Sequence, residues 1–353
     1  MAQAISRLTI KGYKSIRSLE DFELRNLNIL IGPNGGGKSN FVSFFELLEV
    51  MLSEDLEKQL PKFGTATRIF YMGSKFTKTC EFKVHFTGGV TGFNLSICLT
   101  ANSEDELILN PKRPGMFRGE TTGAYDDWGC LDGAQKDIQK GIELYHFHDT
   151  STFAGVKKYC SIRDYEYLRV DASNLAAFLW YLKKKHEKEY QRIREAVQLA
   201  APFFDDFVLR ESIKNPDETL LEWRQKGEDY YFHPSQISDG TLRFICLATA
   251  LLQPNPPSTI IVDEPELGLH PLALALLAEL IEKSSLKTQV IVATQSASLI
   301  SHFDPKDIIV VERKNGESVF RRLPQEKLKQ WIDDYSLGEL WEMNLLEGRP
   351  ENE

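Results

Sequence analysis

The segment ILIGPNGGGKSNF, residues 29–41, constrains the fold of this chain more than any other part of it. Gly32, Gly37, Lys38 and Ser39 fit the pattern G-x-x-x-x-G-K-[ST], whose backbone N–H groups surround phosphate oxygens while the lysine reaches the terminal phosphates. An apolar strand-like run precedes the loop, and apolar residues at helical spacing follow it. A glycine-rich turn without function is the alternative, but the strand–loop–helix context favours a nucleoside triphosphate site.

The three consecutive glycines of this loop cost backbone entropy in any regular element. Without a Cβ atom they can approach phosphate groups closely and adopt positive φ, so we expect them to serve the ligand. Ser39 is the expected Mg²⁺ ligand. The candidate nucleotide-binding residues of the loop are Gly32, Pro33, Asn34, Gly35, Gly36, Gly37, Lys38, Ser39 and Asn40.

A second chemical motif is TIIVDEPELGLHP, an apolar strand that ends in two carboxylates, Asp263 and Glu264. One carboxylate at such a strand end can ligate Mg²⁺ through water, and the next can polarise an attacking water. A solvated strand end is the alternative. The phosphate loop upstream favours the catalytic interpretation.

A third motif is SDGT, where Ser238, Asp239 and Gly240 form a polar turn before an apolar helix. Such a turn is an anion site or an ordinary helix N-cap. The order along the chain favours a site, because the phosphate loop comes first, the turn about 200 residues later, and the carboxylate strand shortly after it.

The remaining pattern predicts an α/β fold. Short strand-like segments run from about residue 79 to 147, and residues 174–201 look helical up to Pro202. Apolar strands then alternate with helices, and DIIVVER is the last predicted strand. This alternation predicts a parallel sheet built from both ends of the chain.

Composition excludes several classes of protein. The formal net charge of -9 argues against an extended DNA-binding face, although a local basic groove stays open. Five scattered cysteines without a CxxC pair indicate a reducing compartment and no structural zinc. No signal peptide or membrane-length apolar run is evident, so we expect a cytoplasmic protein without a membrane partner.

The chain resembles the ABC-type ATPase heads of the RecF and SMC group, and most closely the small AAA-family ATPases related to OLD proteins and anti-phage defence ATPases. The matching stretches are LTIKGYKSI, GPNGGGKSN, SDGT, VDEPELGLHP and VIVATQS. The resemblance implies an ABC-type P-loop ATPase head with a mixed β lobe and an inserted helical lobe. The expected parts are an N-terminal ATPase lobe (1–150), a helical/β insert (151–235) and a C-terminal ATPase lobe (236–353).

The same resemblance implies roles for single residues and for the cofactors ATP and Mg²⁺. Asp263 would be the second magnesium residue and Glu264 the catalytic base. Ser238 and Gly240 would complete the nucleotide site of a second copy of the chain. Gln295 occupies the position of a switch histidine, but a glutamine cannot take a proton.

Three further residues have open roles. No glutamine marks the loop that usually joins the two lobes, so His148 and Asp149 are candidates for that junction; a structural turn and a metal cluster with His146 are the alternatives. His270 lies where the resemblance places a dimer-interface loop, and a packed histidine is its alternative.

We therefore expect an ATPase that dimerises head to head on MgATP, as a dimer or higher oligomer, in anti-phage defence or DNA repair. It would act with a separately encoded effector such as a nuclease, and DNA is a candidate partner. The alternative is an ATP-gated scaffold or sensor that controls a toxic partner. An ATPase subunit of a transporter is a weaker third interpretation.

Two segments outside these motifs also leave their roles open. The helix KKKHEKEYQRIRE is a solvated face or a nucleic-acid contact, and the segment LKQWIDDYSLGELWEMNLL is a packed terminal helix or a partner surface.

Overall fold

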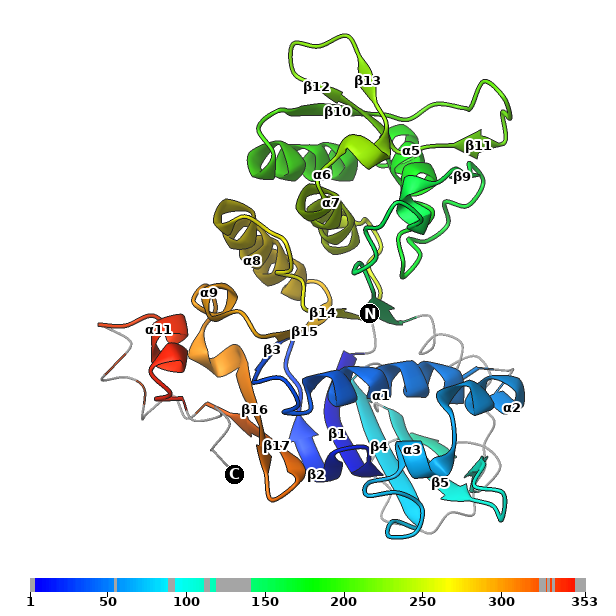
Figure 1. The fold of residues 1–353 in the computed structure, drawn as a ribbon, viewed down its shortest axis with the longest axis vertical. Coiled ribbons are helices and arrows are strands. Elements are labelled where there is room, and N and C mark those ends of the chain that lie inside the picture. Colours follow the sequence, from blue (N-terminus) through cyan, green and yellow to red (C-terminus); the bar gives the residue numbers. More distant parts are fainter. Residues whose placement is uncertain are drawn as a thin grey trace. The chain divides into compact units, whose positions relative to one another are not determined.

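The computed structural model describes residues 4–53, 56–87, 93–110, 115–118, 141–323, 328, 331 and 334–346. The chain divides into two compact units, drawn in Figure 1. The first unit contains residues 1–144, 257–261 and 288–353, and the second contains residues 145–256 and 262–287. The lobe boundaries expected at residues 150 and 235 stay a prediction.

One sheet of the first unit is antiparallel, in the order β2-β1-β4-β5-β6, with β7 also paired to β5. On β4 every second residue is buried, which is the pattern of a sheet with one face on the core. Its strands are β1 (Ala4–Tyr13), β2 (Ile16–Glu23), β4 (Thr79–Thr87), β5 (Phe93–Ala101), β6 (Leu107–Leu109) and β7 (Gly115–Arg118).

The other sheet, most of whose residues belong to this unit, has the order β17-β16-β3-β15-β14-β8. All five residues of β3 are buried, and β3 pairs in parallel with both β15 and β16, which confirms the predicted parallel sheet from both chain ends. The strands are β3 (Leu27–Ile31), β8 (Ile142–Tyr145), β14 (Thr259–Asp263), β15 (Gln289–Thr294), β16 (Ile308–Lys314) and β17 (Glu317–Arg322).

Strand β17 corrects the prediction that DIIVVER is the last strand. It pairs antiparallel with β16 through a turn at Asn315 and Gly316, whose φ angles are 51° and 79°. Asn-Gly between two strands is the typical sequence of a tight hairpin, because both central residues need positive φ. The signal was therefore present in the sequence.

The helical elements of the first unit include one long helix, α1 (Lys38–Met51). The short ones are α2 (Leu56–Gln59), η1 (Leu60–Phe63), α3 (Ala66–Ile69), α9 (Ala297–Ile300), η4 (Pro305–Asp307) and α11 (Leu337–Glu342). Helix α11 packs on α9, and its Leu340 and Trp341 are buried whereas Trp331 is 38% exposed. The terminal helix is therefore mainly a packed element.

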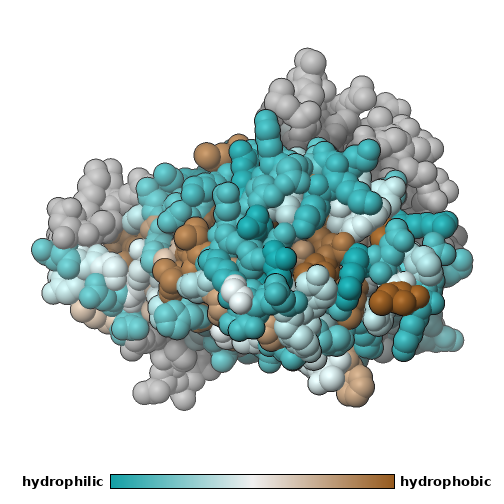
Figure 2. All heavy atoms as spheres, turned by 90° about the horizontal axis from the view of Figure 1, so that it is seen from above, coloured by the Kyte–Doolittle hydropathy of each residue, from teal (hydrophilic) through white to brown (hydrophobic). Residues whose placement is uncertain are grey.

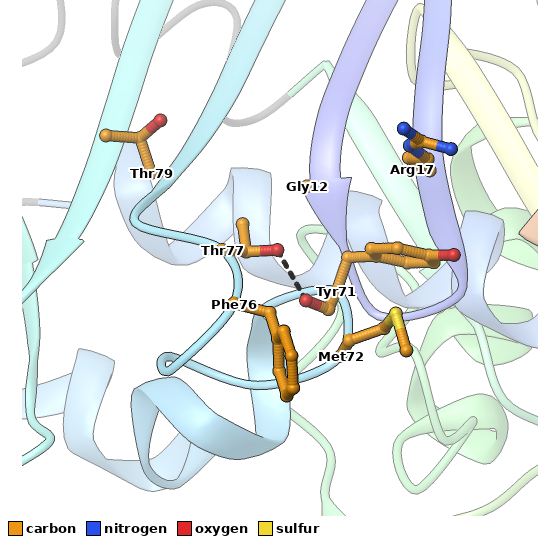
Figure 3. A pocket seen from close by; sticks show the side chains of 7 residues that line it. All are labelled: Gly12, Arg17, Tyr71, Met72, Phe76, Thr77 and Thr79. Carbon is orange, nitrogen blue, oxygen red and sulfur yellow. Dashed lines mark hydrogen bonds between the residues drawn. The ribbon is translucent and has the colours of Figure 1, made fainter.

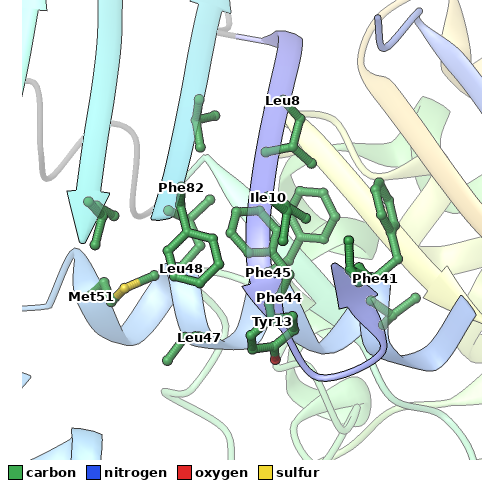
Figure 4. Packing of buried hydrophobic residues seen from close by; sticks show 14 of the residues in the cluster. Leu8, Ile10, Tyr13, Phe41, Phe44, Phe45, Leu47, Leu48, Met51 and Phe82 are labelled. Atoms are coloured by element: carbon green, nitrogen blue, oxygen red, sulfur yellow. The ribbon is translucent and has the colours of Figure 1, made fainter. Parts of the chain in front are cut away.

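Helix α1 forms the centre of the hydrophobic core (Figure 4). Its buried apolar residues belong to one core cluster with residues of both sheets, which explains the wide apolar face of the helix. Phe44 lies 5.2 Å from Phe82 of the antiparallel sheet, measured between ring centroids. The same cluster includes Ile291 and Ile309 of the parallel sheet. This packing fixes the helix that begins at the phosphate loop.

The second unit contains helices and small antiparallel sheets. Helix α6 packs against both α7 and α8. The elements are η2 (Gly155–Lys157), β9 (Cys160–Ser161), α5 (Leu175–Lys185), α6 (Glu187–Ala200), β10 (Phe204–Val208), β11 (Glu218–Thr219), β12 (Glu222–Gln225), β13 (Tyr231–Phe232), η3 (Pro234–Gln236), α7 (Asp239–Leu252) and α8 (Pro271–Ser285).

The expectation of one helix over residues 174–201 is wrong at His186. This residue has φ -134° and ψ 56°, so α5 ends before it and α6 begins after it. Glu187 and Glu189 in the first turn of α6 favour a new helix start, because carboxylates stabilise the positive end of a helix dipole.

Among the described helices, none is long and apolar enough to cross a bilayer. Hydrophilic residues cover most of the face seen in Figure 2, and the hydrophobic residues on it form separate small areas.

Candidate nucleotide site

The phosphate loop is a tight turn between β3 and α1. The backbone N–H of Gly36 donates to the carbonyl oxygen of Pro33 at 3.1 Å. Gly35 is the third residue of this turn and has φ 78°. A four-residue turn whose second residue is extended requires positive φ at its third residue, and glycine adopts that angle without strain. The strand–loop–helix arrangement predicted from the sequence is therefore present.

The other glycines of the loop are required by packing as well. A Cβ atom at Gly32 would lie 2.0 Å from the carbonyl oxygen of Val311 on β16. Gly37 has φ 118°, and a Cβ there would lie 2.1 Å from Oγ of Ser318 on β17. The expected role of Gly35, Gly36 and Gly37 in ligand binding stays a prediction, and the structure adds that Gly32 and Gly37 leave room for the β16–β17 hairpin.

The start of α1 suits an anion. Its N-cap Gly37 makes no side-chain cap hydrogen bond, and its first turn contains no acidic residue. The N–H groups of a first helical turn lack acceptors within the helix and carry a partial positive charge. The donor set of this loop therefore fits a phosphate group.

The two side chains that follow the loop differ in exposure. Lys38 is buried, and its Nζ donates to the carbonyl oxygens of Gly32 at 2.6 Å and Pro33 at 3.1 Å, so the ammonium lies against the start of the loop. Ser39 is exposed. A hydroxyl is the kind of oxygen ligand that Mg²⁺ accepts.

A hydrogen-bonded row of side chains supports the loop from behind. Asn40 Nδ2 donates to Ser15 Oγ at 2.6 Å, the Oγ atoms of Ser15 and Ser318 are 2.6 Å apart, and Ser318 Oγ donates to the carbonyl oxygen of Gly36 at 2.7 Å. Sequence reasoning did not assign roles to Ser15 and Ser318. The Asn-Gly hairpin signal that precedes Ser318 was the available clue.

Strand β14 carries Asp263 as its last residue, and Glu264 follows directly. Glu264 has a backbone φ angle of 43°, a value that residues other than glycine rarely adopt. Strained backbone of this kind occurs preferentially at functional sites. Ser39 belongs to the first unit and Asp263 to the second, and their joint role as metal ligands stays a prediction.

The SDGT turn begins helix α7. Ser238 is the N-cap, and its Oγ accepts the backbone N–H of Thr241 at 3.2 Å. A Cβ at Gly240 would lie 2.1 Å from the carbonyl oxygen of Gly268. The turn thus rests directly on the loop after the two carboxylates, which explains the glycine at position 240. Its predicted contact with a nucleotide in trans stays a prediction.

Arg243 on α7 joins three segments of the second unit. Its guanidinium donates to the carbonyl oxygens of Phe147 at 3.0 Å and His148 at 3.2 Å. It also donates to the carbonyl oxygen of Leu267, in the loop that follows Glu264. Arg243 is 9% exposed, so these bonds lie in a largely desolvated environment.

Lys157 connects the segment that follows His148 and Asp149 to the SDGT turn. Its buried Nζ donates to the carbonyl oxygen of Thr150 at 2.5 Å and to Asp239 Oδ1 of the SDGT turn at 3.2 Å. Sequence reasoning missed both Lys157 and Arg243, because nothing in their spacing marks them as partners of the motifs.

His148 and Asp149 thus lie in a segment whose backbone is bonded to α7 by Arg243. Burial lowers the pKa of His148, and the charge of Arg243 lowers it further. The pKa of Asp149 is lowered by hydrogen bonds from the side chain and backbone of Ser151. No cluster of three or more potential metal-ligating side chains occurs within the described residues. The role of His148 and Asp149 as a lobe junction stays a prediction.

His270 and Gln295 lie next to helix starts. His270 is the exposed N-cap of α8, and its Nδ1 accepts the backbone N–H of Leu272 at 3.3 Å. Gln295 follows the last residue of β15 and precedes Ser296, the N-cap of α9. Their predicted roles at a dimer interface and in catalysis stay predictions.

A match to a known protein family covers a part of the chain that follows the phosphate loop. Residues 148–301 match the family described as "AAA domain, putative AbiEii toxin, Type IV TA system". No curated protein matches the chain.

Solved SMC heads have the same fold. A SmcHead bound to the C-winged helix domain of ScpA has a TM-score of 0.62 at 18% identity, covering 92% of this chain and 99% of that one. A Pyrococcus furiosus Smc head bound to the C-terminal domain of ScpA has a TM-score of 0.57 at 17% identity, covering 94% and 99%. The SMC head domain from Thermotoga maritima has a TM-score of 0.50 at 14% identity, covering 91% and 99%. The chain therefore has the fold of SMC head domains, as the sequence resemblance predicted.

Proposed function

We propose that this chain binds MgATP at the phosphate loop and hydrolyses it as a conformational switch. The observation that carries this proposal is the loop itself, where a glycine turn leads into an uncapped helix start beside a buried lysine. Lys38 would contact the terminal phosphates, and the N–H groups of the first turn of α1 would hold the phosphate oxygens.

The proposed chemistry needs one base and one metal. Ser39 and Asp263 would hold Mg²⁺, which neutralises phosphate charge when it is bound. Glu264 would orient and polarise the attacking water, which is the task of a base in phosphoryl transfer. The positive φ of Glu264 supports this role, because such strain is maintained at sites where the side-chain direction matters.

The proposed switch is the head-to-head closure of two copies. Ser238 and Gly240 would then contact the nucleotide of the second copy, and His270 would lie near the interface. The side chains of Leu267 and Leu272, which flank His270, are 41% and 52% exposed. Exposed apolar residues beside a candidate site are consistent with a surface that another chain covers.

The proposed biological setting is anti-phage defence or DNA repair with a separate effector such as a nuclease, and DNA as a further partner. The family description names a toxin and a toxin–antitoxin system, and two of the similar heads are bound to ScpA, so partner binding is known for this fold. A sensor that gates a toxic partner is the second candidate. It is favoured by Gln295, because a glutamine at the switch position cannot relay a proton.

The substitution Glu264→Gln tests the proposed ATP-hydrolysing switch. It keeps the size of the side chain but removes the base, so ATP turnover should fall by at least about 100-fold while ATP still stabilises dimers in light scattering. The exposed Glu279 on α8 provides the matched control, and Glu279→Gln should leave both properties unchanged. Full activity of the Glu264→Gln protein would exclude Glu264 as the base.

A further measurement separates the two candidates. If the protein is an ATPase coupled to DNA, DNA should raise its turnover, and pull-downs need not recover another polypeptide. If it is an ATP-gated sensor, a polypeptide partner should bind only in one nucleotide state, and loss of turnover in Glu264→Gln should not prevent that binding.

A further inference from the structure

We propose that Ser318, supported by Ser15, orients the Gly36–Gly37 peptide so that its N–H group faces the bound phosphates. This inference rests on the proposed nucleotide site and adds two positioning residues to it. Ser318 lies on β17, 282 residues after Gly36, and is 3% exposed.

The direction of each hydrogen bond in the row can be assigned from the donors available. The Asn40 side-chain N–H can only donate, so Ser15 Oγ accepts it. The carbonyl oxygen of Gly36 can only accept, so Ser318 uses its single hydroxyl proton there. The remaining bond, between the two Oγ atoms, must then use the hydroxyl proton of Ser15. Each hydroxyl therefore donates once and accepts once.

The bond to Gly36 fixes the direction of the next N–H group. In a trans peptide the carbonyl of one residue and the N–H of the next point in opposite directions within one plane. With the Gly36 carbonyl held toward Ser318, the Gly37 N–H points away from β17. This is the last N–H group before helix α1, next to those that we propose to hold phosphate.

The loop needs this external hold because the peptide joins two glycines. A peptide between glycines can rotate into alternative φ and ψ regions at little steric cost. If it rotated, the carbonyl oxygen would replace the N–H group at the phosphate and repel it. The same Ser318 Oγ also limits the space beside Gly37, where a Cβ would lie 2.1 Å away.

The test compares Ser318→Ala, Ser318→Cys and Ser15→Ala, with Ser18→Ala as the control. Ser18 is an exposed serine three residues from Ser15, and its hydroxyl donates to Glu20 Oε1 at 2.9 Å. The first measurement is amide hydrogen exchange of residues 29–41 in the nucleotide-free protein. The second is binding of ATP and of pyrophosphate, which contacts the loop through phosphates alone.

Ser318→Ala should raise the exchange rate of the loop and weaken both ligands by roughly five- to tenfold, the effect of one lost hydrogen bond. Ser318→Cys should lie between Ala and wild type, because a thiol is a weak donor. Ser15→Ala should have a smaller effect, since Ser318 can still donate to Gly36. Ser18→Ala should match wild type.

The outcomes separate this inference from the proposed function. Unchanged loop exchange in Ser318→Ala would overturn the positioning role, whatever the ligand data show. A lower melting temperature with unchanged ATP and pyrophosphate affinity would also overturn it, because that pattern belongs to a purely structural residue. A wild-type protein that binds neither ligand would instead remove the proposed nucleotide site.

Discussion

Glu143 provides a quantitative test of the electrostatics in the first unit. It lies on β8, at one end of the sheet that contains the phosphate-loop strand β3. Burial raises its pKa to about 7 from the ordinary 4.5, and repulsion by Glu49 on α1 adds to the effect. The carboxyl group is therefore largely protonated in the folded protein at mildly acidic pH.

The sign of the effect on stability follows from proton uptake. Between pH 4.5 and about 7 the folded protein holds a proton on Glu143 that the unfolded chain has lost, so the free energy of unfolding falls as pH rises through this window. A shift of this size corresponds to at most about 3 kcal/mol. Partial exposure of the side chain makes roughly 1 to 2 kcal/mol the expected effect.

The assay is urea unfolding of wild type and Glu143→Gln at pH 5 and pH 8, followed by circular dichroism. Glutamine has the same shape but does not titrate, so the variant should gain roughly 1 to 2 kcal/mol over wild type as pH goes from 5 to 8. The control is Glu81→Gln, an exposed residue on β4. An equal difference between wild type and Glu143→Gln at both pH values would refute the argument.

Three further predictions concern other parts of the chain. Gly338→Ala should lower the melting temperature, at a cost of about 1 to 3 kcal/mol in the free energy of unfolding, because a Cβ would lie 2.3 Å from both Ala297 O and Ser301 Oγ. Arg243→Met should lower the free energy of unfolding, measured in urea, by about 2 to 4 kcal/mol, because three mostly buried carbonyl groups lose their hydrogen-bond donor. Arg243→Lys should recover part of this loss. The pKa of His148 is lowered, so the stability contributed by its neutral form is complete above the ordinary pKa of 6.5 and is lost as pH falls through the lower folded value. The amide protection factors of residues 145–150, which are corrected for the intrinsic exchange rate at each pH, should fall with acid in wild type but not in His148→Gln.

The cavity of about 490 Å³ near the end of β1 and the start of β4 is a feature that the sequence did not indicate (Figure 3). Its lining combines exposed apolar side chains, Met72 and Phe76, with Arg17 and two threonines. These residues come from β1, β2, β4 and the loop before β4, and only the folded sheet brings them together. No local pattern marks such a set.

Local chemistry made the phosphate loop and its strand predictable. The spacing of Gly32, Gly37 and Lys38 needs no distant partner, and the apolar run LNILI can only be a fully buried strand or part of a buried helix. The Ser15–Ser318 contact joins residues 303 positions apart, and no periodicity encodes it. The break at His186 was missed for a different reason, because the side chains on both sides favour helix and only the backbone angles of one residue separate α5 from α6.

The position of β3 between β15 and β16 has a consequence for the synthesis of the chain. Both hydrogen-bonded neighbours of the phosphate-loop strand, residues 289–294 and 308–314, are translated long after it. At about 5 to 20 residues per second, LNILI waits roughly 15 to 60 s on the ribosome without its sheet. During this time the short apolar segment LNILI is available to chaperones. In a chain that terminates before residue 308, the segment would stay available, because β16 would be missing.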